Sequence, residues 1–187
     1  MAPAKKGFNE YMIENDTVYV HLVNKKGDKF DTLIDLDDLD RFVKLGYHWS
    51  LERTPTGIKG RYARATVQLG CVDGKQKTTT VKLHRLIMNA QPLYQVDHIN
   101  HNTLDNRKSN LRISTPNENY HNRYASNSNN TSGYRNVSKI CNQWYVQMQV
   151  EGKNTCLKKF PLDKLEEAGL YAELMRKKYY GMFAGNN

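Results

Sequence analysis

A polar segment near the middle of the chain restricts the possible folds more than any other part of the sequence. Residues 95–99 have the composition of a strand, an asparagine-rich loop follows, and residues 111–114 can form a second short strand. Thr115, Pro116 and Glu118 then supply an N-cap, a first-turn proline and the acid of a capping box. The segment therefore predicts a strand, a loop, a strand and a helix, in that order.

This predicted unit presents side chains that suit hydrolysis of a phosphodiester bond. Asp97 and His98 come from the first strand, and Asn119 comes from the first turns of the helix. A histidine, with an unperturbed pKa near ~6.5, can accept the proton of an attacking water, and carboxylate and amide oxygens suit a hard divalent cation. Successive strand residues face opposite sides, so a shared site for Asp97 and His98 requires a twist or a bulge at the strand end. Taken alone, His98 is better explained as a satisfied surface histidine.

The predicted helix decides which of its own side chains can accompany Asn119. Residues three and four positions later share its face, whereas the residue two positions later does not. Asn122 and Arg123 are therefore expected beside Asn119. His121 is expected to point elsewhere, which makes it the weaker ligand candidate.

The pattern D-H-I-N-x-N-x-x-D-N-R-x-x-N-L-R at residues 97–112, with N-x-x-N-R at 119–123, resembles HNH (ββα-metal) endonucleases of the phage homing type. The preceding stretch from Leu83 to Met88 also resembles that family, in which such a stretch leads into the motif. The spacing is kept as well, since the middle asparagine lies 12 positions after the histidine and the last motif residue lies nine positions after that asparagine.

The resemblance implies roles for four residues. His98 would be the general base, Asp97 and Asn119 would bind the metal, and Asn110 would brace the loop and help to orient the base. Asn119 departs from the histidine of the family pattern, and a neutral oxygen ligand favours Mg²⁺ or Mn²⁺ over zinc. The family leaves a 3′-hydroxyl and a 5′-phosphate. Asn110 can equally be a turn residue.

Three arginines of the same segment, Arg107, Arg112 and Arg123, have two interpretations. Beside a scissile phosphate they would act as clamps, and elsewhere they would be solvated charges. His84 can be a core histidine or can support the site residues, and His101 receives no role.

The N-terminal region, residues 1–82, is expected to be rich in strands. The helical spacing of residues 35–46 interrupts them, and Gly46 can end that helix. Four aspartates between Asp35 and Asp40 could suggest a metal site, but a helix start that favours carboxylates explains them more simply. Strands are expected at residues 17–23, 29–34, 47–52, 61–69 and 77–83.

A polar, turn-forming linker at residues 124–132 precedes a module at 133–187 that predicts a three-stranded meander and a helix over 162–180. Its pattern, from the Tyr134-Arg135 dipeptide to Glu166-Glu167-Ala168, resembles the DNA-binding domain of plant ethylene-response transcription factors. In that family the sheet lies in the major groove of DNA. The resemblance implies the DNA-reading set Arg135, Ser138, Gln147, Gln149 and Asn154, with Cys156 as a further candidate. Several arginines of the plant domains are missing, and a purely structural appendage is the alternative.

The net charge of +9 favours a polyanionic partner, although a solvated basic face explains charge alone equally well. Residues 81–187 hold 15 basic against 8 acidic side chains, whereas residues 1–80 hold 13 against 11. Three cysteines without a C-x-x-C pair argue against a disulfide framework and against a cysteine-based zinc site, and they fit a reducing cytosol. We expect no signal peptide and no membrane span.

The sequence thus predicts a modular α+β protein with four parts: a β-rich region (1–82), an HNH core (83–123), a linker (124–132) and a sheet-plus-helix DNA-binding module (133–187). The predicted function is metal-dependent cleavage of double-stranded DNA at a recognised site by an intracellular, phage-type enzyme. A homing endonuclease is the first interpretation. The alternatives are an HNH restriction endonuclease and a non-catalytic DNA-binding regulator. A monomer would nick, and a homodimer could cut both strands.

Overall fold

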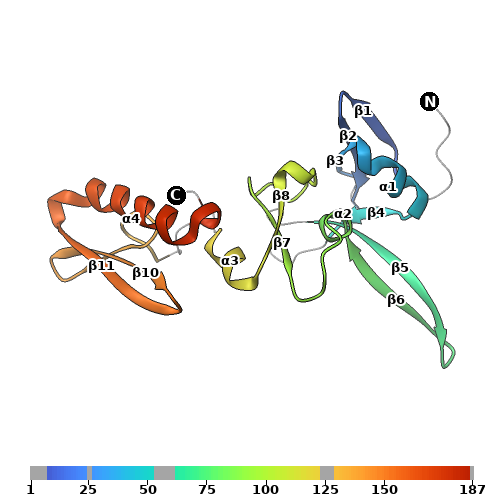
Figure 1. Ribbon diagram of the computed structural model, residues 1–187. Coiled ribbons are helices and arrows are strands. Elements are labelled where there is room, and N and C mark those ends of the chain that lie inside the picture. Colours follow the sequence, from blue (N-terminus) through green and yellow to red (C-terminus); the bar gives the residue numbers. More distant parts are fainter. Residues whose placement is uncertain (1–7, 25–26, 53–61, 123–128, 186–187) are drawn as a thin grey trace. The chain divides into compact units, whose positions relative to one another are not determined.

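The computed structural model describes residues 8–24, 27–52, 62–122 and 129–185 of the chain. The chain divides into two compact units, Met1–Ser114 and Thr115–Asn187, and each is described by itself. Both units combine small antiparallel sheets with helices, so the predicted α+β class is confirmed (Figure 1). The boundary at Ser114 falls inside the segment predicted as the HNH core.

The first sheet is a meander in the strand order β1-β2-β3. Its strands are β1 (Tyr11–Glu14), β2 (Thr17–Val23) and β3 (Lys29–Asp35). Alternate residues of β2 are fully buried, as expected for a strand with one face on a core. The 3₁₀ turn η1 (Leu36–Asp38) and helix α1 (Leu39–Leu45) follow, and Gly46 ends the helix with a left-handed φ of 61°. The aspartates between Asp35 and Asp40 therefore lie at a helix start.

The second sheet carries a long two-stranded ribbon. Its strands are β4 (Trp49–Leu51), β5 (Ala63–Val72) and β6 (Lys75–Lys82), in the order β4-β5-β6. Trp49 is fully buried and stacks on Phe42 of α1, with ring centroids 5.6 Å apart. Helix α2 (Leu83–Ile87) follows β6 directly. Leu83 was predicted to end a strand, but it begins this helix and is fully buried there.

The third sheet of the first unit contains only β7 (Gln95–His98) and β8 (Leu111–Ser114), with η2 (Lys108–Asn110) before β8. Two short strands are marginal alone. The N-terminal sheet supports them, because Leu33 of β3 donates its N–H to the Leu104 carbonyl at 2.8 Å and accepts the Asn106 N–H at 2.8 Å. Val96 and Leu111 also join the same apolar core as β2 and α1. The loop of the motif is therefore held by β3.

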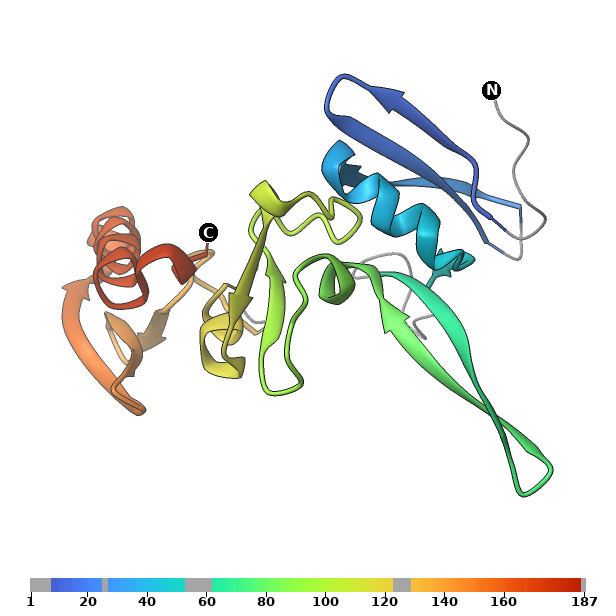
Figure 2. The ribbon, with the colours of Figure 1, turned by 45° about the vertical axis from the view of Figure 1, so that its right-hand side comes forward.

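The second unit is a three-stranded sheet with one covering helix, as the sequence predicts. Trp144, Val146 and Met148 of the middle strand pack against Ala168 and Ala172 of α4, which lies along the sheet (Figure 2). The strand order is β11-β10-β9. The elements are α3 (Pro116–His121), β9 (Val137–Ile140), β10 (Gln143–Val150), β11 (Lys153–Pro161), η3 (Leu162–Lys164), α4 (Leu165–Tyr180) and η4 (Gly181–Phe183).

Two predicted features fall partly outside the described residues. Arg123 lies there, and so do residues 124–128 of the predicted linker. The described end of that linker is a turn in which Ser132 Oγ donates to the Val137 carbonyl at 2.8 Å. All three cysteines are exposed and unpaired. None of the helices in the described ranges has the length and apolarity that a membrane crossing requires.

Candidate active site

His98 ends β7 and is buried, with only 4% of its surface exposed. Its ring lies edge-to-face with the ring of His84, at a centroid distance of 5.2 Å, and 5.8 Å from the ring of Tyr62. Tyr62 in turn lies 4.9 Å from His84. His84 belongs to α2, so the helix that precedes the motif forms one wall around the imidazole.

Asn106 fixes the chemical state of His98. The Asn106 Nδ2 donates to Thr32 Oγ1 at 2.7 Å and to the Leu104 carbonyl at 3.3 Å, and a carbonyl can only accept. The amide oxygen must therefore face His98, whose Nε2 lies 3.3 Å away. A neutral imidazole then carries its proton on Nε2 and its lone pair on Nδ1.

The pKa values of both site histidines are lowered. Burial lowers the pKa of His98, while the hydrogen bond that His98 donates to Asn106 and the carboxylates of Asp97 and Asp105 oppose this effect. Burial, with help from positive neighbours, lowers the pKa of His84 to about 3. The Nδ1 of His84 is also buried with no hydrogen-bond partner among the described residues. Both imidazoles are therefore neutral at neutral pH, and the one at His98 is in the form that accepts a proton.

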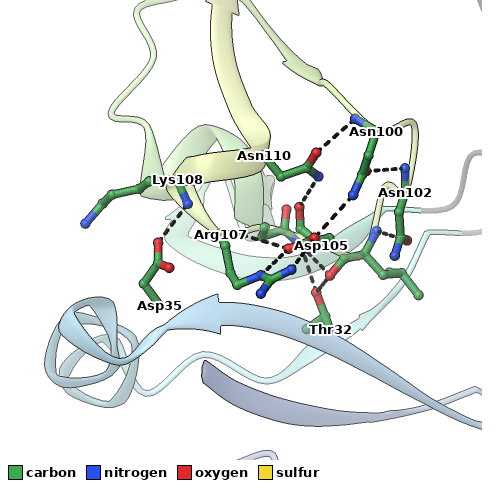
Figure 3. A network of polar contacts seen from close by, with 10 residues as sticks. Thr32, Asp35, Asn100, Asn102, Asp105, Arg107, Lys108 and Asn110 are labelled. Carbon is green, nitrogen blue, oxygen red and sulfur yellow. Dashed lines mark hydrogen bonds and ion pairs between the residues drawn. The ribbon is translucent and has the colours of Figure 1, made fainter. Parts of the chain in front are cut away.

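Asn110 ties the loop after β7 into a closed shape (Figure 3). Its side-chain oxygen accepts the Asn100 N–H at 2.9 Å, and its Nδ2 donates to the Asp105 carbonyl at 2.8 Å. The Asn110 carbonyl also accepts the N–H of Ile99 at 2.9 Å. These bonds join both ends of the loop and hold the chain that leaves His98.

Asp105 is the ionic anchor of this loop. Arg107 binds it in a bidentate pair, with Nε 2.8 Å from Oδ1 and Nη2 2.8 Å from Oδ2. The guanidinium holds the pKa of Asp105 below its ordinary value. Lys108 extends the network to the N-terminal region, since its N–H donates to Asp35 at 2.7 Å (Figure 3). Its ammonium lies 2.9 Å from Asp38. Two aspartates of the acidic run therefore bind the motif loop.

Asp97 is buried and paired with Arg112, its cross-strand neighbour in the ladder. Arg112 Nε and Nη2 lie 2.8 and 2.6 Å from the same carboxylate oxygen, Oδ2. The four pairs of this ladder run without a register shift, so the bulge considered above is not present among them. Alternation directs Asp97 toward Arg112 and His98 toward His84, so the two side chains leave opposite faces of β7. A site shared by Asp97 and His98 stays a prediction that requires a twist at the strand end.

A divalent cation fits the donor chemistry of the predicted ligands. Mg²⁺ binds oxygen atoms and typically uses only one or two carboxylates, with phosphate and water completing its shell. Asp97 offers a carboxylate and Asn119 offers an amide oxygen. Within the described ranges, no three His, Cys, Asp or Glu side chains lie close enough together to form a metal site. A cation bound through Asp97 and Asn119 would therefore need phosphate and water oxygens to complete its shell.

Asn119 belongs to the second unit, in the short helix α3. The predicted capping box is confirmed there, since Thr115 Oγ1 accepts the Glu118 N–H at 3.3 Å and Glu118 accepts the Thr115 N–H at 2.7 Å. His121 stacks on Tyr180, with ring centroids 3.8 Å apart. The convergence of Asn119 with Asp97 and His98 stays a prediction.

The predicted DNA-reading residues of the second unit differ in their surroundings. Arg135 is buried and donates to the carbonyls of His121 at 3.1 Å and Ala184 at 3.5 Å, so its guanidinium is used inside the unit. The other four line a polar hollow of about 480 Å³, together with Arg135. Ser138 donates to Gln147 there at 3.3 Å. The four residues are Ser138, Gln147, Gln149 and Asn154.

Several residues around His98 were not assigned from the sequence. Asn106 is central to the site, yet its partner Thr32 lies 74 positions away, so only the D-N-R portion of the motif hinted at it. Tyr62 carried no local signal. His84 had been left open, and the structure places it against the ring of His98.

Comparisons of the sequence with known proteins find two matches, and both cover part of the chain. A protein of Acanthamoeba polyphaga mimivirus, named as an uncharacterized HNH endonuclease, is 37% identical over 92 residues, which are 49% of this chain and 46% of the relative. The chain thus matches about half the length of that relative. No solved structure matches the chain. The model of the HNH endonuclease family matches residues 81–121, the segment that holds His98, Asn106 and Asn110.

Proposed function

We propose that this protein is a metal-dependent endonuclease that hydrolyses phosphodiester bonds of double-stranded DNA. The observation that carries the proposal is the fixed tautomer of His98, a buried imidazole whose Nε2 faces the oxygen of Asn106. A histidine held in this way presents Nδ1 as the base for an attacking water.

Each residue of the proposed site has its own role in the reaction. His98 takes a proton from water, Asn106 holds its ring, and Asn110 holds the loop that follows it. Asp97 and Asn119 would hold the divalent cation, which supplies positive charge beside the phosphate. Arg112 is paired with the carboxylate of Asp97, so a bound metal would have to share that carboxylate with Arg112 or displace the guanidinium. Arg107 is bound to Asp105 and acts on the loop rather than on phosphate.

Recognition of a defined DNA site is part of the proposal. The second unit supports it with exposed or half-exposed amides on one sheet face, since Gln and Asn side chains can pair with adenine edges. The likeness to plant ethylene-response domains rests on sequence pattern and on the sheet-plus-helix arrangement. A homing endonuclease is the first candidate and a restriction endonuclease the second.

The test is cleavage of a supercoiled plasmid with Mg²⁺ or Mn²⁺. We expect wild-type protein and a His48→Ala control, altered at an exposed histidine of the same unit, to cut. His98→Ala is expected to bind the same DNA without cutting, and chelation of the cation should stop wild-type cleavage. Equal cutting by His98→Ala removes His98 from the mechanism. Binding without cleavage by the wild type would instead support the non-catalytic regulator. End mapping then shows whether the cuts fall at one sequence and in one strand or both.

A further inference from the structure

The β5–β6 ribbon is an exposed element that the proposed catalysis does not use. From Thr66 to Thr80 every residue of β5 and β6 is exposed except the half-buried Val67. Figures 1 and 2 show the ribbon reaching away from the other elements of the first unit. A two-stranded ribbon exposed on both faces gains little stability by itself, which indicates a role in binding.

One face of the ribbon is polar apart from the thiol of Cys71. The ladder pairs Thr66 with Thr80, Gln68 with Thr78 and Cys71 with Gln76, and side chains of such pairs lie on the same face. A bulge at Leu69 changes the register between the last two pairs and adds to the twist of the ribbon. We call Thr66, Gln68, Gln76, Thr78 and Thr80 the polar face. It contains hydroxyl and amide groups and no carboxylate.

The charge of the ribbon complements a polyanion. Its strands and turn, residues 63–82, hold four basic side chains, Arg64, Lys75, Lys77 and Lys82, against Asp73 as the single acidic one. Lys75 and Lys77 lie near the tip on the face opposite the polar face, and Lys82 at the base forms an ion pair with Glu52. A ribbon with amides on one face and lysines near its tip fits DNA, because amides can pair with base edges and lysines can reach phosphates.

The ribbon is also continuous with the candidate active site. Tyr62, which contacts both His84 and His98, immediately precedes β5. Lys82 ends β6 with its ammonium 4.7 Å from the centre of the Tyr62 ring. DNA bound at His98 therefore passes the base of the ribbon. At a rise of about 3.3 Å per residue, the ten residues of β5 extend over about 33 Å, close to one turn of DNA.

We propose that the β5–β6 ribbon enters the major groove of double-stranded DNA and reads bases with its polar face, within about one helical turn of the cut. The major groove, about 12 Å wide, admits a two-stranded ribbon. This inference rests on the proposed function, because it places the DNA at His98. It assigns sequence recognition to the first unit in addition to the second.

The test compares two double variants that each remove two exposed side chains. Gln68→Ala with Gln76→Ala changes the polar face, and Val72→Ala with Thr79→Ala changes the opposite face as the matched control. Wild-type protein first selects its preferred sequences from a pool of random 40-base-pair duplexes, without divalent cation. We expect the polar-face variant to bind the selected duplex about 5- to 100-fold more weakly and to lose base preference at positions on one side of the cut. The control should stay within about twofold.

Chemical protection of the major groove and the salt dependence of binding give two further readouts. Wild-type protein should protect guanine N7, in the major groove, from dimethyl sulfate on that side of the cut, and the polar-face variant should not. Lys75→Gln with Lys77→Gln should lower the slope of log affinity against log salt by about 2 without changing the selected sequence.

Three results would overturn the inference. They are an unchanged sequence preference in the polar-face variant, equal weakening by the control, and protection only of adenine N3 in the minor groove. A ribbon that joins two copies of the chain would leave the selected sequence unchanged, and substitution of the exposed Leu69 by Ser would then lower the mass in sedimentation. Plasmid cleavage is measured separately from binding. If the ribbon does not read bases, cleavage by the wild type still supports the nuclease proposal. If the wild type does not cleave, the binding and protection experiments still show whether the ribbon lies in the major groove.

Discussion

Replacement of Asn106 by aspartate tests how the base is controlled. Asn106→Asp preserves the shape of the side chain but sets a negative charge 3.3 Å from Nε2 of His98. Coulomb's law with an effective dielectric constant of about 20 gives an attraction of about 5 kcal/mol at that distance. Shifts seen beside an opposite charge are about 1 to 3 pKa units, so we expect the pKa of His98 to rise by that amount.

A higher pKa of His98 should shift the pH dependence of cleavage. Burial lowers the pKa of His98 in the wild type, so its cleavage rate should reach a plateau at a pH below the ordinary value near ~6.5. In Asn106→Asp the rate should keep rising through a pH about 1 to 3 units higher, because the imidazole must lose a proton before it acts as a base. The variant should therefore be slow at pH 7 and recover as the pH is raised.

The assay is single-turnover cleavage of plasmid DNA between pH 5 and pH 9. Asn102→Asp is the matched control, since it adds the same charge to an exposed residue of the same loop and keeps the oxygen that accepts the Leu104 N–H. The new carboxylate oxygen replaces the Nδ2 donor, so Thr32 Oγ1 must turn its proton from the Leu104 carbonyl to that oxygen, and the carbonyl keeps the Leu33 N–H. If the rise of the cleavage rate with pH in Asn106→Asp occurs at the same pH as in the wild type, or at a lower pH, the assigned contact between Asn106 and His98 is refuted.

Three predictions concern stability, each measured by urea unfolding. The pKa of His84 falls from 6.5 to about 3 on folding, so the free energy of unfolding should decrease as the pH falls from 6.5 toward 3, by about 2 kcal/mol at pH 5. His84→Phe should flatten this dependence of stability on pH. An unchanged dependence in the variant would contradict the burial of that imidazole. Arg112→Ala leaves the carboxylate of Asp97 buried without its partner and should cost about 3 to 5 kcal/mol, whereas a loss below about 1 kcal/mol would mean the pair is solvated. Gly169→Ala should destabilise the second unit by about 1 to 3 kcal/mol, because its new Cβ would lie 2.4 Å from the Tyr134 ring; stabilisation, as helix propensity alone predicts, would show that the ring moves aside.

Local signals in the sequence were sufficient for the elements that short-range chemistry determines. The capping box at Thr115 and the left-handed Gly46 each need only neighbours within a turn, and both were predicted. Strand β1 carried no alternating pattern that was recognised, and its burial explains this, since Met12 and Ile13 are about half exposed. Apolar residues on a solvent-facing strand give a pattern that does not indicate which face is buried.

The contacts that hold the site were harder to predict because they join distant segments. The pairing of Arg112 with Asp97 follows from the register of β7 and β8, and could have been deduced once both strands were aligned. The support of Asn106 by Thr32 requires the N-terminal sheet to lie against the motif loop, which no spacing within the motif specifies. Motif spacing therefore predicted the reactive residues, but not the contacts that position them.

The dependence of the motif on β3 explains why residues before the HNH segment belong to the site. The Leu104 carbonyl accepts the Leu33 N–H, and the Asn106 N–H donates to the Leu33 carbonyl. The side chain of Asn106 contacts His98 while its amide nitrogen donates to Thr32. Two strands of four residues each cannot fix such a loop alone, since they bury little apolar surface and pair through only four residues each. The N-terminal sheet supplies the missing rigidity through a buried core shared with Val96 and Leu111. Geometry at the imidazole is thus set from outside the sequence motif, which is a general route for placing a catalytic group accurately on a small fold.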